Sequence, residues 1–146
     1  MPAGSCLCGA VRFEVTGELS QIELCHCVKC RKAYGAAFAS TLYARIDDFR
    51  WLAGERSVAT FDAPVESRPP AYRHCFCRTC GSPLPLVLEG LPLVELPAAT
   101  FDDAIEARPR YHMFVAQKSE WLEIADSLER HHGPSPFSGK VLRTLL

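Results

Sequence analysis

Short segments that alternate hydrophobic and polar residues run through most of the chain and predict β-strands. Residues 10–16, Ala-Val-Arg-Phe-Glu-Val-Thr, alternate in this way and are rich in β-branched and aromatic side chains, which is typical of a half-buried strand. A short helix is expected at 27–34, ending at Gly35. Shorter strands are expected at 22–24, 37–43, 49–52, 58–61, 71–76, 84–88, 93–96 and 111–115.

The spacing of these strands predicts a mainly β fold with several small antiparallel sheets and little helix. Residues 84–88 and 93–96 are expected to pair as a hairpin around Glu89-Gly90, and the prolines of 63–70 indicate a loop. We expect one domain over 1–132. The remaining 133–146 form a C-terminal tail that packs on the domain or on a partner, which leaves a homodimer open.

Composition limits the classes of function. The chain has 146 residues, of which 48% are hydrophobic and 23% charged, enough for the core of one soluble domain. A net charge of −1 and a pI near 6.5 argue against nucleic acid or an anionic membrane as a partner. The first residues have neither a basic nor an apolar run, so no signal peptide is evident. Abundant thiols then favour a reducing compartment, and the cytoplasm is the expected location.

Seven of the eight cysteines lie in three tight clusters, and this pattern predicts a thiophilic metal. A tetrahedral zinc site holds its sulfurs about 2.3 Å from the metal, so neighbouring thiols need a turn between them. Gly9 and Gly81 supply the backbone freedom for such turns. The clusters read Cys6-Leu7-Cys8-Gly9, Cys25-His26-Cys27-Val28-Lys29-Cys30 and Cys77-Arg78-Thr79-Cys80-Gly81.

The number of thiols in each cluster predicts two different zinc sites. Two pairs complete a closed structural site with four sulfurs, formed by Cys6, Cys8, Cys77 and Cys80. Three thiols remain and leave one coordination position open, as in a catalytic zinc site, formed by Cys25, Cys27 and Cys30. Two Zn²⁺ ions per chain are expected, although the second is easily lost.

Three alternatives stay open at this stage. Disulfides would also explain an even number of cysteines, although a Cys-x-Cys spacing is awkward for pairing within a cluster. Cys75 lies two residues before Cys77 and on the same side of a strand, so it is able to exchange with a ligand. His26 lies between two thiols, and as a fourth ligand it would close the second site.

The three motifs resemble the glutathione-dependent formaldehyde-activating enzyme family, which shares its domain with centromere protein V. The resemblance covers residues 4–128 and includes the flanks Gly4-Ser5, Arg31-Lys32 and Ser82-Pro83-Leu84. The closing motif of the family is resembled by Tyr111-His112-Met113-Phe114, followed by Trp121 and residues 124–128. Cys75 and the atypical end Glu129-Arg130-His131-His132 depart from the family pattern.

The resemblance implies a tent-like arrangement of coiled sheets around the structural zinc, with the ligand sets given above. It also implies a zinc-dependent carbon–sulfur lyase, similar to S-(hydroxymethyl)glutathione synthase, with glutathione as the thiol partner and formaldehyde or a related aldehyde as its co-substrate. The alternative is a non-enzymatic zinc module that binds a protein or chromatin.

His112 is the candidate proton shuttle or supporting partner at the catalytic site, or else a strand histidine whose hydrogen bonds are satisfied within the protein. Basic side chains near the second cluster are candidates to meet a glutathione carboxylate, and Trp121 is expected in the core or a pocket wall; the basic residues are Lys29, Arg31 and Lys32.

Overall fold

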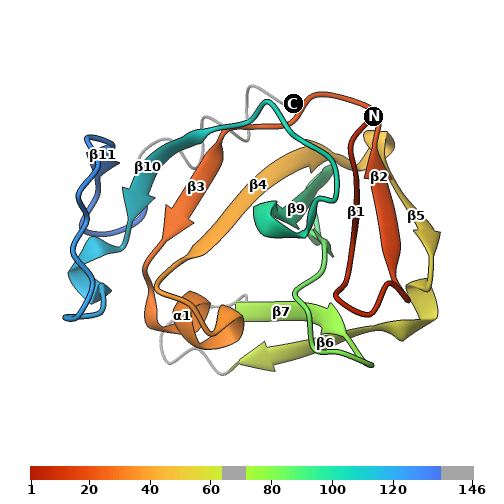
Figure 1. Cartoon of the computed structure of the whole chain (residues 1–146), viewed down its shortest axis with the longest axis horizontal. Helices are drawn as coiled ribbons and strands as arrows, with labels where there is room; N and C mark the ends of the chain where they lie inside the picture. Colours follow the sequence, from red (N-terminus) through yellow and green to blue (C-terminus); the bar gives the residue numbers. More distant parts are fainter. Residues whose placement is uncertain (64–71, 136–146) are drawn as a thin grey trace.

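A computed structural model describes residues 1–63 and 72–135, and the described strands form three sheets (Figure 1). The strands are β1 Ala3–Ser5, β2 Arg12–Val15, β3 Ile22–Cys25, β4 Ala39–Arg45, β5 Phe49–Ala53, β6 Val58–Ala63, β7 Tyr72–Cys77, β8 Leu86–Val87, β9 Leu93–Pro97, β10 Pro109–Met113 and β11 Glu129–Arg130. One α-helix, α1 Val28–Tyr34, and four 3₁₀ turns, Ile46–Asp48, Glu55–Ser57, Ala98–Thr100 and Val115–Gln117, complete the described elements.

The largest sheet has six strands in the order β11-β10-β3-β4-β9-β8. Its pairings are antiparallel, as the sequence predicts, except that β10 runs parallel to both β3 and β11. Parallel neighbours need a long connection, and about 80 residues separate β3 from β10, so hairpin geometry does not restrict the direction of β10. The other two sheets are β1-β2-β5 and the hairpin β6-β7.

The main hydrophobic core lies between the six-stranded and the three-stranded sheets, which Figure 1 shows on opposite sides of the molecule. Phe13 and Val15 of β2 are fully buried against Leu24, Leu42 and other apolar residues of the large sheet. Alternation along each strand places these side chains on one face. The β6-β7 hairpin and α1 lie at the lower edge of the view and bring the second and third cysteine clusters to this end.

Most of the predicted elements are present, with shifted ends. The helix begins after Cys27 and ends at Gly35, whose φ of 58° is left-handed, and β8 and β9 form the predicted hairpin. The strand predicted at 37–43 is displaced to β4. Strands β5 and β6 flank Gly54 as predicted but join different sheets, because β5 pairs with β2 and β6 with β7.

Two predicted segments fall largely outside the described residues. These are the loop at 63–70, of which only residue 63 is described, and the C-terminal tail at 133–146, which is described to residue 135. At the start of that tail, the carbonyl oxygen of Gly133 accepts a hydrogen bond from the backbone N–H of Phe114 at 2.8 Å. Among the described helices, none has the length and apolar character needed to span a bilayer.

Candidate metal centres and their surroundings

Four cysteines from two distant turns form the first candidate metal centre. The β1–β2 turn supplies two of them, and the end of β7 with the turn after it supplies the other two. Their four sulfur atoms all lie within 4.8 Å of one another. The backbone N–H of Leu7 also donates to the hydroxyl oxygen of Ser82 at 2.9 Å, which joins the two turns directly. The group consists of Cys6, Cys8, Cys77 and Cys80.

The two turns share a backbone design. The N–H of Gly9 donates to the carbonyl of Cys6, and the N–H of Gly81 donates to the carbonyl of Cys77, each at 2.8 Å. Both glycines have positive φ angles, 73° and 75°, a region that residues with a side chain rarely adopt. An added Cβ would meet no atom within 4 Å at either position. The glycines are therefore required by backbone conformation and not by space.

The sulfur distances fit a tetrahedral metal. Sulfurs about 2.3 Å from a tetrahedral centre lie about 3.8 Å apart. The Sγ atoms of Cys6 and Cys8 are 3.5 Å apart, and those of Cys8 and Cys77 are 3.9 Å apart. All eight cysteines are free, so the disulfide alternative does not describe this fold. The hydroxyl and backbone N–H of Ser82 lower the pKa of the Cys80 thiol to about 5, which favours the thiolate that a metal requires.

Three cysteines form the second candidate metal centre. Cys25 ends β3, Cys27 is the N-cap of α1, and Cys30 lies in the first turn of that helix. Their sulfurs lie within 4.8 Å of one another, and the backbone N–H of Cys30 donates to the sulfur of Cys27 at 3.3 Å. Within residues 1–63 and 72–135, no further His, Cys, Asp or Glu joins this group.

The electrostatics of this triad also fit a cation. Hydrogen bonds with Cys25 and Cys30 lower the pKa of Cys27, whereas the contact with Cys27 raises the pKa of Cys25, and contacts with Cys25 and Cys27 raise the pKa of Cys30. Negative charge therefore collects on one sulfur, since neighbouring thiolates repel one another. Three thiolates can coexist at these distances only when a positive ion lies between them, so the donor set fits a thiophilic metal.

Cys75 and His26 lie outside both groups of sulfurs. Cys75 is buried in a small core with Val11 and Leu84, and burial raises the pKa of its thiol to about 11. His26 is fully buried, but its ring points to His112, with Nε2 of His26 2.8 Å from Nδ1 of His112. Neither side chain is placed as a metal ligand in this structure.

His112 lies on the opposite face of the large sheet from Cys25. In the parallel pairing of β10 with β3, His112 is level with Leu24, whose side chain is in the hydrophobic core, and Met113 is level with Cys25. Successive residues of a strand point to opposite faces. His112 therefore contacts the residue next to the thiols, His26, and any influence on the triad passes through that ring.

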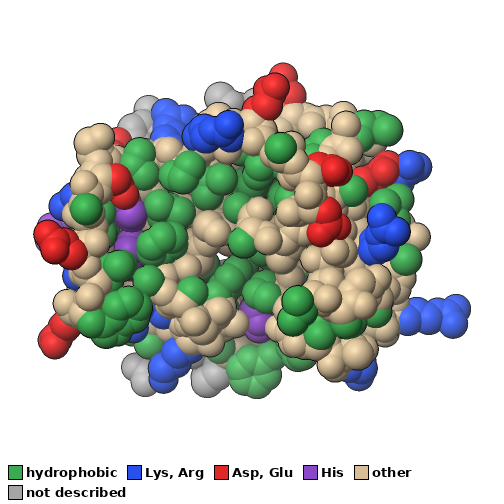
Figure 2. All heavy atoms as spheres, in the orientation of Figure 1, with side chains coloured by type: hydrophobic (Ala, Val, Ile, Leu, Met, Phe, Trp, Pro, Cys, Tyr) green, Lys and Arg blue, Asp and Glu red, His purple; other side chains and the backbone are tan. Residues whose placement is uncertain are grey.

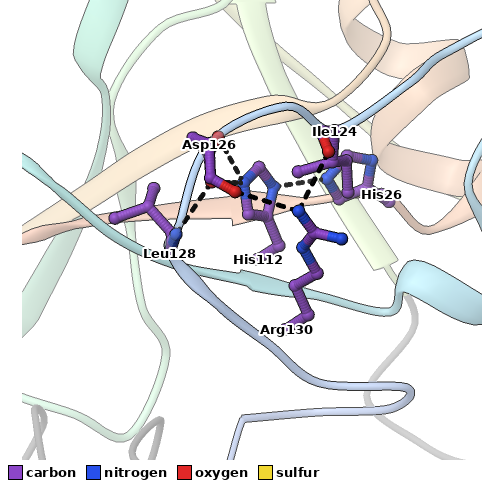
Figure 3. A network of polar contacts seen from close by, with 6 residues as sticks. All are labelled: His26, His112, Ile124, Asp126, Leu128 and Arg130. Carbon is purple, nitrogen blue, oxygen red and sulfur yellow. Dashed lines mark hydrogen bonds and ion pairs between the residues drawn. The ribbon is translucent and has the colours of Figure 1, made fainter.

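The side chains of His26, His112 and Asp126 form a line of polar contacts, which Figure 3 shows from close by. The Nε2 of His112 lies 3.0 Å from Oδ2 of Asp126, and the N–H of Leu128 donates to Oδ1 of Asp126 at 2.9 Å. Burial and then the charge of His112 lower the pKa of His26 to about 4, so His26 is neutral at pH 7. At the far end of the line, Nδ1 of His26 is buried and has no hydrogen-bond partner among the residues that the structure describes.

Asp126 is a residue that sequence reasoning did not single out. It was visible only as part of the segment 124–128 in the closing motif, and no local spacing connects it to His112, 14 residues earlier.

The expectation that Trp121 lies in the core or a pocket wall is wrong, because this side chain is 75% exposed. Arg31 donates to the carbonyl of His26 at 3.2 Å and to the hydroxyl of Ser119 at 2.9 Å, so its guanidinium is engaged within the protein.

A hollow of about 530 Å³ lies beside α1, and Figure 2 shows it in the middle of the face, walled mainly by apolar side chains. Its lining residues include Tyr34, Phe38, Thr100 and Asp102, together with Cys6 of the four-cysteine group. Tyr34 follows Cys30 by four residues, so both side chains share one face of α1. The described lining contains an acidic residue, Asp102, and no lysine or arginine.

The face of the large sheet that carries Cys25 is polar. Glu23 is 1% exposed and accepts hydrogen bonds from the hydroxyls of Tyr43 and Tyr111. Glu95 pairs with Tyr43 across the β4–β9 ladder, so it shares this face. Burial, and then the charge of Glu23, raise the pKa of Glu95 to about 7. The groups that face Glu95 are Glu23 from β3, Tyr43 from β4, Tyr34 from α1 and Tyr72 from β7.

Glu95 is expected to destabilise the protein as the pH rises. Its pKa in the folded state is above the ordinary value of 4.5, so the folded state binds more protons and stability falls between about pH 4.5 and 7. Glu95→Gln should resemble the wild type at pH 5 and exceed its unfolding free energy at pH 8 by on the order of 3 kcal/mol. Urea unfolding at both pH values measures this difference. The exposed Glu89→Gln serves as control, and a Glu95→Gln effect that is independent of pH would contradict the prediction.

Comparisons with known proteins identify the family of this chain. The family model of the glutathione-dependent formaldehyde-activating enzyme matches residues 1–117, so the resemblance after residue 117 lies beyond that match. A Halomonas elongata protein, provisionally named a glutathione-dependent formaldehyde-activating enzyme, is 33% identical over 126 residues, covering 83% of this chain and 79% of that protein. The crystal structure of a Rhodobacter sphaeroides protein matches with a TM-score of 0.52 and 28% identity, over 73% of this chain and 98% of that one.

Proposed function

We propose, because the chain belongs to the glutathione-dependent formaldehyde-activating enzyme family, that it is a zinc-dependent carbon–sulfur lyase acting on adducts of glutathione with formaldehyde or a related aldehyde. One observation carries the proposal. The three sulfurs of Cys25, Cys27 and Cys30 lie within 4.8 Å of one another, and the described residues add no fourth ligand. This leaves room for the sulfur of a substrate.

The reaction would join a thiol to an aldehyde. The glutathione sulfur attacks the aldehyde carbon, one C–S bond forms, the C=O π bond opens, and the resulting oxygen takes a proton to give S-hydroxymethylglutathione. Zinc held by the three cysteines would supply a positive centre that favours the thiolate form of the incoming thiol. The protein contributes mainly by bringing thiol and aldehyde together in one orientation.

The hollow beside α1 supports a tripeptide substrate. Its volume of about 530 Å³ lies in the usual range for small-molecule sites, about 300–1,000 Å³. Tyr34 lines the hollow and lies on the same face of α1 as Cys30. The three thiols of the triad are not among the lining residues, so we propose that the thiol end of the substrate lies at Tyr34. Asp102, which accepts a hydrogen bond from the hydroxyl of Ser5 at 3.0 Å, offers a carboxylate to the ammonium group of glutathione.

The four-cysteine group is proposed as the structural zinc site. All four positions of a tetrahedral ion would be filled by protein sulfur, so this centre has no place for a substrate. It would instead join two turns about 70 residues apart in the sequence. A non-enzymatic zinc module would have the second centre either closed or without metal, and the described residues offer no fourth ligand that would close it.

Metal analysis and calorimetry test the proposed function. Protein purified under reducing conditions should contain two zinc ions per chain, and glutathione should bind with a saturable heat. S-methylglutathione, whose sulfur cannot ionise, should bind at least about tenfold more weakly because the thiolate contact is lost. Equal binding of the two compounds, or one zinc ion per chain after reconstitution with excess zinc, would contradict the proposal.

A further inference from the structure

His26 lies between Cys25 and Cys27 and makes three hydrogen bonds that hold this part of the backbone in place. Its N–H donates to the carbonyl of Met113 at 3.0 Å, and its carbonyl accepts from the guanidinium of Arg31 at 3.2 Å. Its ring is held by His112 at 2.8 Å. A change in the ring therefore moves the segment that sets the separation of the Cys25 and Cys27 sulfurs.

If both histidine rings are neutral, the hydrogen bonds of this line allow only one arrangement of protons. A carboxylate only accepts hydrogen bonds, so the Nε2 of His112 that faces Asp126 carries a proton. As a neutral ring, His112 then presents an unprotonated Nδ1, which accepts the Nε2–H of His26. The buried Nδ1 of His26 is left as a lone pair, which suits an atom without a partner better than an N–H would, because a buried unpaired donor is costly.

We infer that Asp126 is a positioning residue for the three-cysteine centre: through His112 it fixes the tautomer and orientation of His26, and with them the spacing of the Cys25 and Cys27 thiols. This inference rests on the proposed function only in taking the triad as a metal site. Asp126 touches neither thiol group, and its side chain is 46% exposed, whereas His112 and His26 are 2% and 0% exposed. The line thus connects a surface carboxylate to the inner side of the triad.

Asp126→Asn is predicted to reverse this arrangement. Both carboxylate oxygens lie near Nε2 of His112, Oδ2 at 3.0 Å and Oδ1 at 3.2 Å, and Oδ1 also accepts the N–H of Leu128. If the asparagine oxygen keeps the contact with Leu128, the amide nitrogen takes the nearer position, that of Oδ2, and points its hydrogens at Nε2 of His112. His112 must then accept there and carry its proton on Nδ1. His26 in turn moves its proton to Nδ1, where residues 1–63 and 72–135 offer no acceptor, and its ring must shift to find one.

Asp126→Ala separates this effect from a merely structural one. Alanine removes the contact with Leu128 and the acceptor for His112, but it imposes no donor on the histidine pair. If Asp126 only held its loop, alanine would be the more damaging change. If Asp126 positions His26, asparagine should weaken the triad at least as much as alanine does. The matched control is Glu129→Gln, which alters a neighbouring carboxylate that faces His131 at 3.6 Å.

Two measurements on the full chain decide between these outcomes. In ¹⁵N NMR of the histidine rings, wild type and Glu129→Gln should carry the proton on Nε2 of both His26 and His112, and Asp126→Asn should carry it on Nδ1. In chelator competition with ¹¹³Cd²⁺, followed by ¹¹³Cd NMR, Asp126→Asn should lower the affinity of the triad by about 10- to 100-fold. The affinity of the four-cysteine group should not change.

The possible failures are distinguishable. A wild-type His112 that carries protons on both nitrogens, or an Asp126→Asn protein with unchanged tautomers, would overturn the inference. So would a triad whose cadmium affinity is lowered by alanine and not by asparagine. A wild-type triad that takes no cadmium would count against the proposed function, and the histidine spectrum would then decide the positioning of His26 by itself.

Discussion

Replacing Cys80 with serine is expected to unfold much of the protein at ordinary temperatures. Cys80 shares a group of four sulfurs that joins the β1–β2 turn to the end of β7. A metal held by such a group couples its binding free energy to folding, and a serine hydroxyl does not replace a thiolate as ligand. We expect the free energy of unfolding to fall by about 3 kcal/mol or more, from a total of about 5–15 kcal/mol for a typical domain. Chemical denaturation with metal analysis measures both effects.

Cys75→Ala is the matched control for this variant. Cys75 is on the same strand as Cys77 and is buried, yet its sulfur belongs to neither metal group. Its removal should cost about 1 kcal/mol of packing and leave the metal content unchanged. If Cys80→Ser proved as stable as Cys75→Ala, with its full metal content, the structural role of the four-cysteine group would be refuted.

Replacing Cys27 with serine should abolish activity and leave the fold intact. The sulfur of Cys27 is one of only three ligands offered by the described part of the second centre, so its loss should empty that centre. Serine is among the preferred N-cap residues of a helix, so it can still accept the N–H of Cys30 that Cys27 accepts now. The rate of adduct formation should fall by about 10³-fold or more, since bound metal contributes several kcal/mol to such reactions.

Val28→Ala is a suitable control for Cys27→Ser, because Val28 lies in the same turn of α1, is 41% exposed and belongs to neither metal group. It should retain zinc and most of the activity. Stopped-flow measurement of formaldehyde consumption, together with the melting temperature of each variant, tests the prediction. Equal unfolding of Cys27→Ser and Cys80→Ser would show that the division into a catalytic and a structural centre is wrong.

Comparison of these centres with the rest of the fold shows what local sequence can predict. Cys27 and Cys30 are separated by one helical turn, and Gly9 and Gly81 each follow a pair of cysteines, so the shape of each turn depends on a few neighbouring residues. Such short-range features were predicted correctly, including the helix that ends at Gly35. The hairpin of β8 and β9 was predicted for the same reason, because its turn residues lie between its strands.

Apart from the meeting of the two cysteine pairs in the four-cysteine group, features that depend on long-range approach were not predicted. The parallel direction of β10, the exposure of Trp121 and the proximity of Asp126 to His112 follow from how distant segments pack. The same holds for Glu95, whose raised pKa requires β3 and β9 to place two carboxylates on one buried face. A window of sequence around Glu95 shows only a strand with one acidic residue.

The sequence by itself determined the composition of both centres, because thiols two or three residues apart can share an ion only if the chain turns between them. It also determined the strand-rich class, through alternation within short segments. Tertiary structure alone decided which way His26 faces. Its ring could turn toward the thiols or away from them, and the register of β10 beside β3, with His112 level with Leu24, draws it to the opposite face. Strand register depends on contacts between residues far apart in the chain, and no local pattern encodes it.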